Sequence, residues 1–176
     1  MKLDGKKVLM VIPHTQFRDE EFFEPKKILE EEGATVLVAS TTIRTCRGMK
    51  GGIADAQVTI ADAKADDYAG IVLCGGSSVP EFLWNDKKLH ELVAAMAGAG
   101  KVVAAICLST VILAKAKLLA GREATVYWLP QAIEELKAAG ARYVPETLLI
   151  QNNIIMAEGP PDSQRFGQAI RAALAA

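Results

Sequence analysis

The 176-residue sequence predicts a three-layer α/β fold, in which helices cover both faces of a mostly parallel β-sheet. Short apolar runs, typical of buried strands, alternate along the chain with longer segments of helical periodicity. Strands separated by helices form right-handed crossovers, which produce a parallel sheet. The chain is long enough to bury one good hydrophobic core, so we expect a single domain over residues 1–176.

The expected strands share a short apolar run rich in valine and isoleucine, bounded by glycine, proline or polar residues. They lie at residues 6–13, 35–40, 69–76, 101–106 and 123–128, with two more inside 148–157. The expected helices share a longer amphipathic repeat. They lie at residues 19–32, 87–100, 109–121, 129–140 and 161–176.

Individual residues support the limits of the elements in the first half. Gly33 suits the end of the first helix, because glycine readily adopts the left-handed conformation there. Pro25 lies inside that helix and should bend it, because proline removes a backbone hydrogen bond. The glycine-rich residues 48–52 predict the turn of a small hairpin at one edge of the sheet, and a glycine pair closes the strand at 69–76.

The second half carries similar signals. The strand at 101–106 passes directly into the next helix. An Asn-Asn pair within residues 148–157 predicts a hairpin with a type I′ turn. Pro161 suits the first turn of the last helix, with Asp162 or Ser163 as its cap.

Composition and charge exclude several classes of protein. Lysine and arginine total 20 against 21 aspartate and glutamate, so the net charge is −1. We therefore expect no nucleic-acid partner and no basic patch for a membrane surface. No apolar stretch approaches the roughly 18 residues of a membrane span, and the first apolar run is too short for a signal peptide. A cytoplasmic protein is the expectation.

The three cysteines, Cys46, Cys74 and Cys107, have no Cys-x-x-Cys spacing. We expect reduced thiols, no metal site and no cofactor, since nucleotide-binding glycine motifs are also missing. Cys46 is expected to be the most exposed thiol. Cys74 is expected to be a buried apolar residue, with a resolving thiol for the pocket as the alternative.

Ligands of parallel sheets bind beyond the carboxyl ends of the strands, and this rule selects the candidate site residues. The segments that follow the first, third and fourth strands are residues 14–21, 75–78 and 107–110.

Cys107 lies between the strand at 101–106 and the next helix, where the sequence predicts a nucleophile elbow. The small residues Ala105 and Ser109 suit the sharp turn of an elbow, which holds its nucleophile in a strained conformation. Ser109 is also a candidate cap of the helix. A helix N-terminus favours the thiolate over the thiol. The alternative is an inert cysteine buried in the core.

The pair Gly75-Gly76 ends the neighbouring strand. Glycine lets the backbone approach a ligand closely, and the N–H groups are available to an oxyanion or an oxidised sulfur. The alternative is a simple tight turn. A glycine pair and a cysteine elbow at neighbouring strand ends together favour a site.

Four segments of the chain read FRDEEFFEPKKILEEEG, IVLCGG, VVAAICLSTVILAKAKLLAGREATVY and IIMAEGPPDSQRFGQAI. In this order, and over nearly the full chain, they resemble the ThiJ/PfpI family, also called the DJ family, of the class I glutamine amidotransferase-like superfamily. The resemblance implies a flavodoxin-like three-layer sandwich with a nucleophile elbow. It also implies assembly as a homodimer or a larger homo-oligomer.

The resemblance assigns roles to single residues. Cys107 takes the position of the elbow cysteine, and Gly75 and Gly76 match the glycines that donate backbone N–H groups. The acid beside the cysteine matches Glu21, with its neighbour Glu20 as the second choice. We expect burial to keep Glu21 protonated, so that it donates a hydrogen bond to the sulfur and the pair shares one proton. The alternative for Glu21 is a solvated helix carboxylate.

Four other residues are candidates for substrate contact or proton transfer. Tyr127 lies where relatives place a histidine or tyrosine, and its alternative is an aromatic residue packed in the core. Leu108 follows the cysteine where peptidase-like members have histidine, which argues against protease chemistry. His14 follows the first strand and is a candidate for the pocket rim or a stand-in base. Arg18 is a candidate to bind a substrate carboxylate or to pair with a nearby glutamate.

Three functions fit these residues. The first is an enzyme in which Cys107 attacks a small reactive carbonyl compound and Glu21 moves the proton, as glyoxalase- or deglycase-like members do. The second is a redox sensor in which an oxidant converts Cys107 to a sulfenic or sulfinic acid. The third is a small-molecule binding domain with a vestigial cysteine.

Overall fold

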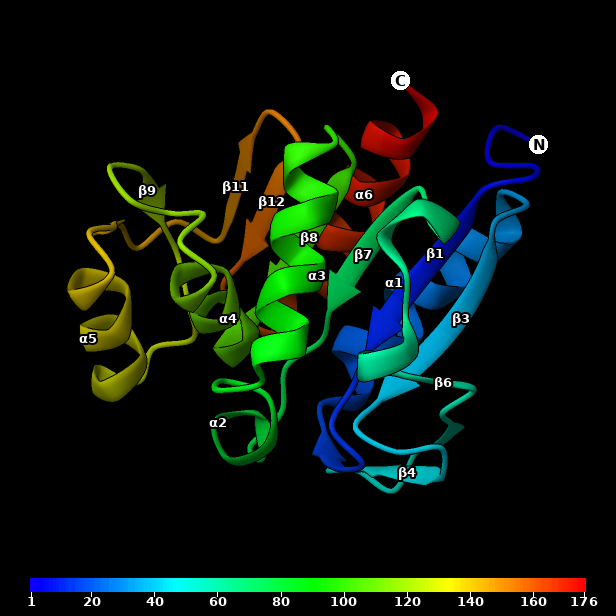
Figure 1. Cartoon of the computed structure of the whole chain (residues 1–176), viewed down its shortest axis with the longest axis horizontal. Coiled ribbons are helices and arrows are strands. Elements are labelled where there is room, and N and C mark those ends of the chain that lie inside the picture. The colour runs from blue at the N-terminus through cyan, green and yellow to red at the C-terminus, as the bar shows by residue number, and fades with distance from the viewer.

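The computed structural model describes residues 1–176, and its centre is a seven-stranded sheet (Figure 1). The strand order is β11-β12-β8-β7-β1-β3-β6, and every neighbouring pair is parallel except β11 with β12. The strands are β1 (Lys7–Val11), β3 (Thr35–Ser40), β6 (Val58–Thr59), β7 (Gly70–Leu73), β8 (Val102–Ile106), β11 (Leu148–Gln151) and β12 (Ile154–Ala157). The central order β3-β1-β7-β8-β12 is the 2-1-3-4-5 order of flavodoxin-like sheets.

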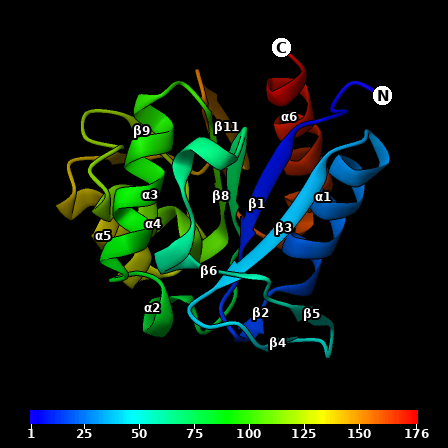
Figure 2. The same cartoon turned by 45° about the vertical axis from the view of Figure 1, so that its right-hand side comes forward.

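Helices cover both faces of this sheet, so the predicted three-layer α/β fold is confirmed (Figure 2). One face is covered by α1 (Asp19–Glu31) and α6 (Ser163–Ala175). The other face is covered by α3 (Lys87–Gly98) and α4 (Thr110–Lys115), with α5 (Pro130–Ala138) packed against α4. Strands β7, β8 and β12 are buried along their whole length, because both of their faces are covered. None of the helices combines the length and apolar character needed to cross a bilayer.

The predicted hairpin exists as β4 (Thr45–Gly48) and β5 (Ile53–Asp55), but it does not extend the central sheet. It forms a separate three-stranded sheet with β2 (Thr15–Phe17), which the sequence did not indicate. Asp19, at the start of α1, accepts hydrogen bonds of 2.8 Å from the N–H groups of Lys50 and Gly52. This side chain therefore fixes the hairpin turn against the helix.

Two elements of the second half are shorter than predicted. Helix α4 ends at Lys115 rather than at residue 121, and Lys117 beyond it has a φ of 65° in the left-handed region. The expected strand over 123–128 is reduced to β9 (Glu123–Ala124), which pairs with β10 (Arg142–Tyr143). The chain then turns towards the elbow.

Two local predictions are wrong in detail. The hairpin of β11 and β12 turns at the Asn-Asn pair, but only Asn152 has a positive φ, which excludes type I′. The Asn153 amide instead donates to the carbonyls of Ala97 and Lys101. Asp162 stands at the N-cap position of α6 but makes no capping hydrogen bond with its side chain, and Ser163 donates to a carbonyl of the preceding turn η4 (Pro160–Asp162).

Candidate active site

Cys107 follows β8 directly and begins one turn of 3-10 helix, η3 (Cys107–Ser109), that leads into α4. Its φ is 62°, a left-handed conformation that costs a non-glycine residue roughly 1–3 kcal/mol. The predicted strained elbow is therefore present. The surrounding structure must hold it, because nothing in the residue itself favours this conformation.

Two side-chain hydrogen bonds hold the elbow. The indole N–H of Trp84 donates to the carbonyl oxygen of Leu108 at 2.8 Å. The hydroxyl of Ser109 donates to the carbonyl oxygen of Cys74 at 2.6 Å, which ties the end of β7 to the elbow. Ser109 occupies the N-cap position of α4 but makes no capping bond, so that prediction is corrected. Its hydroxyl is already committed to the neighbouring strand.

Gly75 lies between Glu21 and Cys107. A methyl group added at Gly75 would collide with the Glu21 carboxyl and would stand 2.6 Å from Cβ and 3.1 Å from Sγ of Cys107. Gly76 has a φ of +143° and pairs with Phe17 of β2. Both positions require glycine, because neighbouring atoms lie too close to leave room for a side chain. The alternative of a simple tight turn does not explain this packing.

The side chain of Glu21 is completely buried, and neither carboxyl oxygen has a protein hydrogen-bond partner of ordinary geometry. Burial raises its pKa to about 8, and the two donor groups nearest the carboxyl, the Cys107 thiol and the Gly75 N–H, oppose this shift without cancelling it. The carboxyl is consequently neutral at pH 7. The solvated-carboxylate alternative for Glu21 is wrong.

Burial also raises the pKa of the Cys107 thiol, and the negative charge of ionised Glu21 raises it further. The backbone N–H groups of Leu108 and Gly76 act in the opposite direction by hydrogen bonding. The expected low thiol pKa at a helix start is therefore corrected, because desolvation is the larger effect. At neutral pH the pair is uncharged, and the proton that remains after the first ionisation is shared between carboxyl and sulfur.

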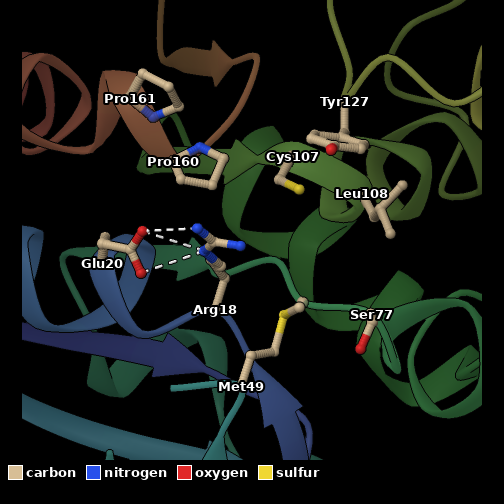
Figure 3. Close-up of a pocket in the computed structure, with 10 residues that line it drawn as sticks. Arg18, Glu20, Met49, Ser77, Cys107, Leu108, Tyr127, Pro160 and Pro161 are labelled. Atoms are coloured by element: carbon tan, nitrogen blue, oxygen red, sulfur yellow. Dashed lines mark hydrogen bonds and ion pairs between the residues drawn. The ribbon is translucent and has the colours of Figure 1, made fainter.

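A cavity of about 570 Å³ opens on Cys107 (Figure 3). It is lined by Arg18, Glu20, Met49, Gly76, Ser77, Cys107, Leu108, Tyr127, Pro160 and Pro161. Only Arg18 and Glu20 among these are charged, and they face each other across a short ion pair. The guanidinium donates from Nε at 3.2 Å and from Nη2 at 2.9 Å.

The ionisation of Glu20 differs sharply from that of Glu21. Burial alone would raise the pKa of Glu20, but hydrogen bonds from Arg18 and Lys50 outweigh it and lower the pKa to about 2. Glu20 is thus a permanent carboxylate on the cavity wall, whereas Glu21 is a neutral acid behind the sulfur. The structure places Glu21, not Glu20, beside Cys107.

The structure brings together most of the residues that the sequence selected. Tyr127 lines the cavity and is 44% exposed, so its alternative as a core aromatic is wrong. Its backbone N–H donates to the Cys107 carbonyl at 3.3 Å. His14 does not line the cavity, because its ring packs edge-on against Phe82 at a centroid distance of 4.5 Å. His90 is bound to the carbonyl of Trp84, so neither histidine reaches the cavity.

Several lining residues were not named from the sequence. Met49 comes from the hairpin turn that Asp19 holds, and its place depends on a contact between distant segments. Pro160 and Pro161 precede α6 and lie across the cavity from Met49 (Figure 3). Ser77 lies in the segment 75–78, which the sequence selected as a strand end without singling out this residue.

Cys107 is the single cysteine on the cavity. Cys46 is fully buried, which corrects the expectation that it is the most exposed thiol. Cys74 is also fully buried, as predicted. Burial raises the pKa of both thiols.

No three histidine, cysteine, aspartate or glutamate side chains lie close enough together to hold a metal ion.

A flavodoxin-like sheet with a strained cysteine at the end of β8 and a buried acid beside the sulfur defines a class of α/β proteins with a cysteine elbow. Residues 6–173 match the model of the DJ-1/PfpI family, and the chain belongs to that family.

Relatives and a solved structure agree with this assignment. An uncharacterised protein of Methanocaldococcus jannaschii is 48% identical over 98% of this chain and 84% of its own. A Pyrococcus abyssi protein named as a deglycase is 30% identical over 88% of this chain and 91% of its own. The crystal structure of a ThiJ/PfpI domain protein from Brachyspira murdochii superposes with a TM-score of 0.91 and 30% identity, covering 97% of each chain.

Proposed function

We propose that the protein is a cysteine-dependent enzyme that acts on small reactive carbonyl compounds, with glyoxalase- or deglycase-type chemistry. The observation that carries this proposal is the pairing of Cys107, open to a cavity, with the buried neutral carboxyl of Glu21. Such a pair supplies a nucleophile and a proton carrier without a histidine.

The first step with a 2-oxoaldehyde is addition of the Cys107 sulfur to the aldehyde carbon. A carbon–sulfur bond forms, and the electrons of the carbonyl double bond move to the oxygen. The N–H groups of Gly76 and Leu108 are the donors nearest the sulfur that can stabilise this oxygen. The pair reacts after it has lost one proton: the sulfur adds as the thiolate and Glu21 gives its proton to the oxygen, which leaves a neutral thiohemiacetal beside the Glu21 carboxylate.

The second stage moves hydrogen within the adduct. The aldehyde carbon loses a proton and is oxidised to the thioester level, while the neighbouring ketone carbon gains a proton and is reduced to an alcohol. Glu21 and Tyr127 are the groups that we assign to these transfers. One water molecule then hydrolyses the thioester, which releases a 2-hydroxy acid and restores the thiol. No external oxidant or reductant is consumed.

Peptidase chemistry receives less support. Leu108 occupies the position after the nucleophile where a Cys-His pair would need an imidazole, and it can neither accept nor donate a proton. The deglycase name of the Pyrococcus abyssi relative supports carbonyl chemistry instead.

The test is turnover of methylglyoxal, followed by formation of lactate. Cys107→Ser should abolish turnover, and Glu21→Gln should lower kcat by about 10²- to 10⁴-fold, the usual contribution of a positioned acid or base. Cys46→Ala, which changes a thiol away from the cavity, is the matched control and should keep the wild-type rate. Full activity in Cys107→Ser would refute the proposal. Absence of turnover in the wild type would favour a binding domain or a sensor.

A redox sensor is the second candidate, because one observation favours it. Cys107 is the only thiol on the cavity, and the N–H groups of Gly76 and Leu108 are placed to hold an oxidised sulfur. A peroxide would transfer one oxygen atom to the sulfur and leave as water, and a second equivalent would give the sulfinic acid. Mass spectrometry after peroxide treatment tests this: oxidation confined to Cys107, without methylglyoxal turnover, would support the sensor over the enzyme.

We also propose assembly into at least a homodimer, as is common in this family. The exposed side chains of Phe23 on α1 and Ile53 on β5 are apolar surfaces that a second copy would cover. Sedimentation velocity should show a species of at least twice the 18.8 kDa chain mass. A purely monomeric protein at micromolar concentration would contradict this.

A further inference from the structure

Arg18 presents an unused donor to the cavity. Its Nε and Nη2 atoms donate to Glu20, whereas Nη1 makes no hydrogen bond within the chain. Figure 3 shows the guanidinium held at the cavity wall by Glu20, with the third nitrogen directed away from Glu20 into the cavity. The ion pair therefore orients the arginine but does not use all of its donors.

Arg18 does not have the Glu20 carboxylate to itself. Lys50 also approaches Glu20, at 3.3 Å, so two cations share one carboxylate. Glu21 is neutral at pH 7 because burial raises its pKa to about 8. The other lining residues carry no permanent charge. An anionic group on a ligand would consequently find a partner at this wall, and a cationic group would not.

The geometry favours a carboxylate in particular. A guanidinium is a planar fork of donors that matches a carboxylate, and one already fixed by a second ion pair loses little freedom when it binds. Arg18 and Cys107 line the same cavity of about 570 Å³, so one small molecule can contact both. The cavity is roomy for methylglyoxal, which has no anionic group to pair with the Arg18 guanidinium.

We propose that the preferred substrate is a 2-oxoaldehyde that carries a carboxylate, with the carboxylate bound by Nη1 of Arg18 and the aldehyde carbon attacked by Cys107. This inference rests on the proposed carbonyl chemistry and adds the substrate class. The covalent steps are those given above, and the carboxylate takes no part in them. Arg18 thus determines specificity.

The test compares 4,5-dioxopentanoate with its methyl ester, two 2-oxoaldehydes that differ at the far end, where the ester is neutral and carries one additional methyl group. The ratio of kcat/KM for the acid to kcat/KM for the ester should exceed about 10 in the wild type. Arg18→Gln should lower this ratio by about 10- to 100-fold, the usual effect of a charged hydrogen bond. Arg142→Gln, at a 73%-exposed arginine that pairs with Glu123 away from the cavity, is the matched control.

A binding measurement separates this inference from the proposed function. In Cys107→Ser protein, titration calorimetry should show the acid binding at least about 10-fold more tightly than the ester, and Arg18→Gln in that background should remove the difference. Equal affinities, or equal kcat/KM values in the wild type, would overturn the inference and leave carbonyl chemistry intact. Absence of turnover of any aldehyde would overturn the proposed function, while the affinities would still decide the role of Arg18.

Discussion

The indole N–H of Trp84 donates a 2.8 Å hydrogen bond to the carbonyl oxygen of Leu108, the residue that follows the elbow cysteine. Trp84 is only 3% exposed, and its own carbonyl is bound by Nε2 of His90 at 2.8 Å. The chain from His90 through Trp84 to Leu108 therefore links α3 to the elbow. This link helps to hold Cys107 at its unfavourable φ of 62°.

We expect Trp84→Phe to destabilise the protein and to loosen the elbow. The substitution leaves the buried Leu108 carbonyl without a donor, which costs about 1–3 kcal/mol in free energy of unfolding. Urea unfolding should show this loss, and alkylation of Cys107 in the native protein should change in rate. Trp128→Phe is the matched control, because Trp128 is 76% exposed. Equal stability of the two variants would contradict the role given to Trp84.

Gly75→Ala should damage the site and Gly98→Ala should not. The added methyl at Gly75 would press on both Glu21 and Cys107, and overpacking of this kind costs about 1–3 kcal/mol. Gly98, near the end of α3, has free space around it, so alanine there should stabilise the protein by about 0.5–1 kcal/mol. Thermal unfolding and methylglyoxal turnover of both variants check this. A fully active, stable Gly75→Ala protein would show that the close approach is unimportant.

The fold was predictable because its strands are local apolar runs. Strands β1, β3, β7 and β8 appear in the sequence as short segments rich in valine and isoleucine, and burial on both faces of a parallel sheet explains that composition. The segment 123–128 has the same character but does not become a full strand. Its residues form hydrogen bonds outside a strand ladder. The Thr125 hydroxyl donates to the Glu146 carbonyl, and the Tyr127 N–H donates to the Cys107 carbonyl.

The site was only partly predictable. Strand ends pointed to Cys107 and the glycine pair, because the carboxyl edge of a sheet is encoded by element order. The sequence could not indicate the exposure of Cys46, since a cysteine in a short polar hairpin gives no sign of which way it points. Nor could it reveal that desolvation outweighs the helix N-terminus at the Cys107 thiol. Both depend on packing between segments far apart in the chain.

The stability of the protein should fall as pH rises from about 4.5 to 8, and Glu21 should be a cause. Its folded-state pKa of about 8 lies above the ordinary 4.5, so the unfolded chain releases this proton at lower pH than the folded protein. The contribution of Glu21 to the slope is at most about 1.4 kcal/mol per pH unit between those values. Glu21→Gln should flatten the dependence. Urea unfolding at several pH values measures it, and parallel slopes in the two proteins would exclude Glu21.

The alkylation of Cys107 should depend on pH in two steps, because the sulfur and the Glu21 carboxyl titrate as a pair. Loss of the first proton, near pH 8, creates a population with a thiolate beside a neutral carboxyl, and labelling by iodoacetamide should begin there. Loss of the second proton is opposed by the charge already present. In Glu21→Gln there is no second acid, so a single step should remain.

Mass spectrometry can follow this labelling at each cysteine separately. Cys46 and Cys74 are fully buried and serve as internal controls, so they should stay unlabelled until the protein unfolds. Labelling of Cys107 at the same slow rate would mean that the cavity does not admit the reagent to the sulfur, and the nucleophile assignment would fail. Identical profiles in the wild type and Glu21→Gln would mean instead that Cys107 is reactive but titrates alone. Only a two-step profile that becomes one step in the variant supports the shared proton on which the proposed chemistry depends.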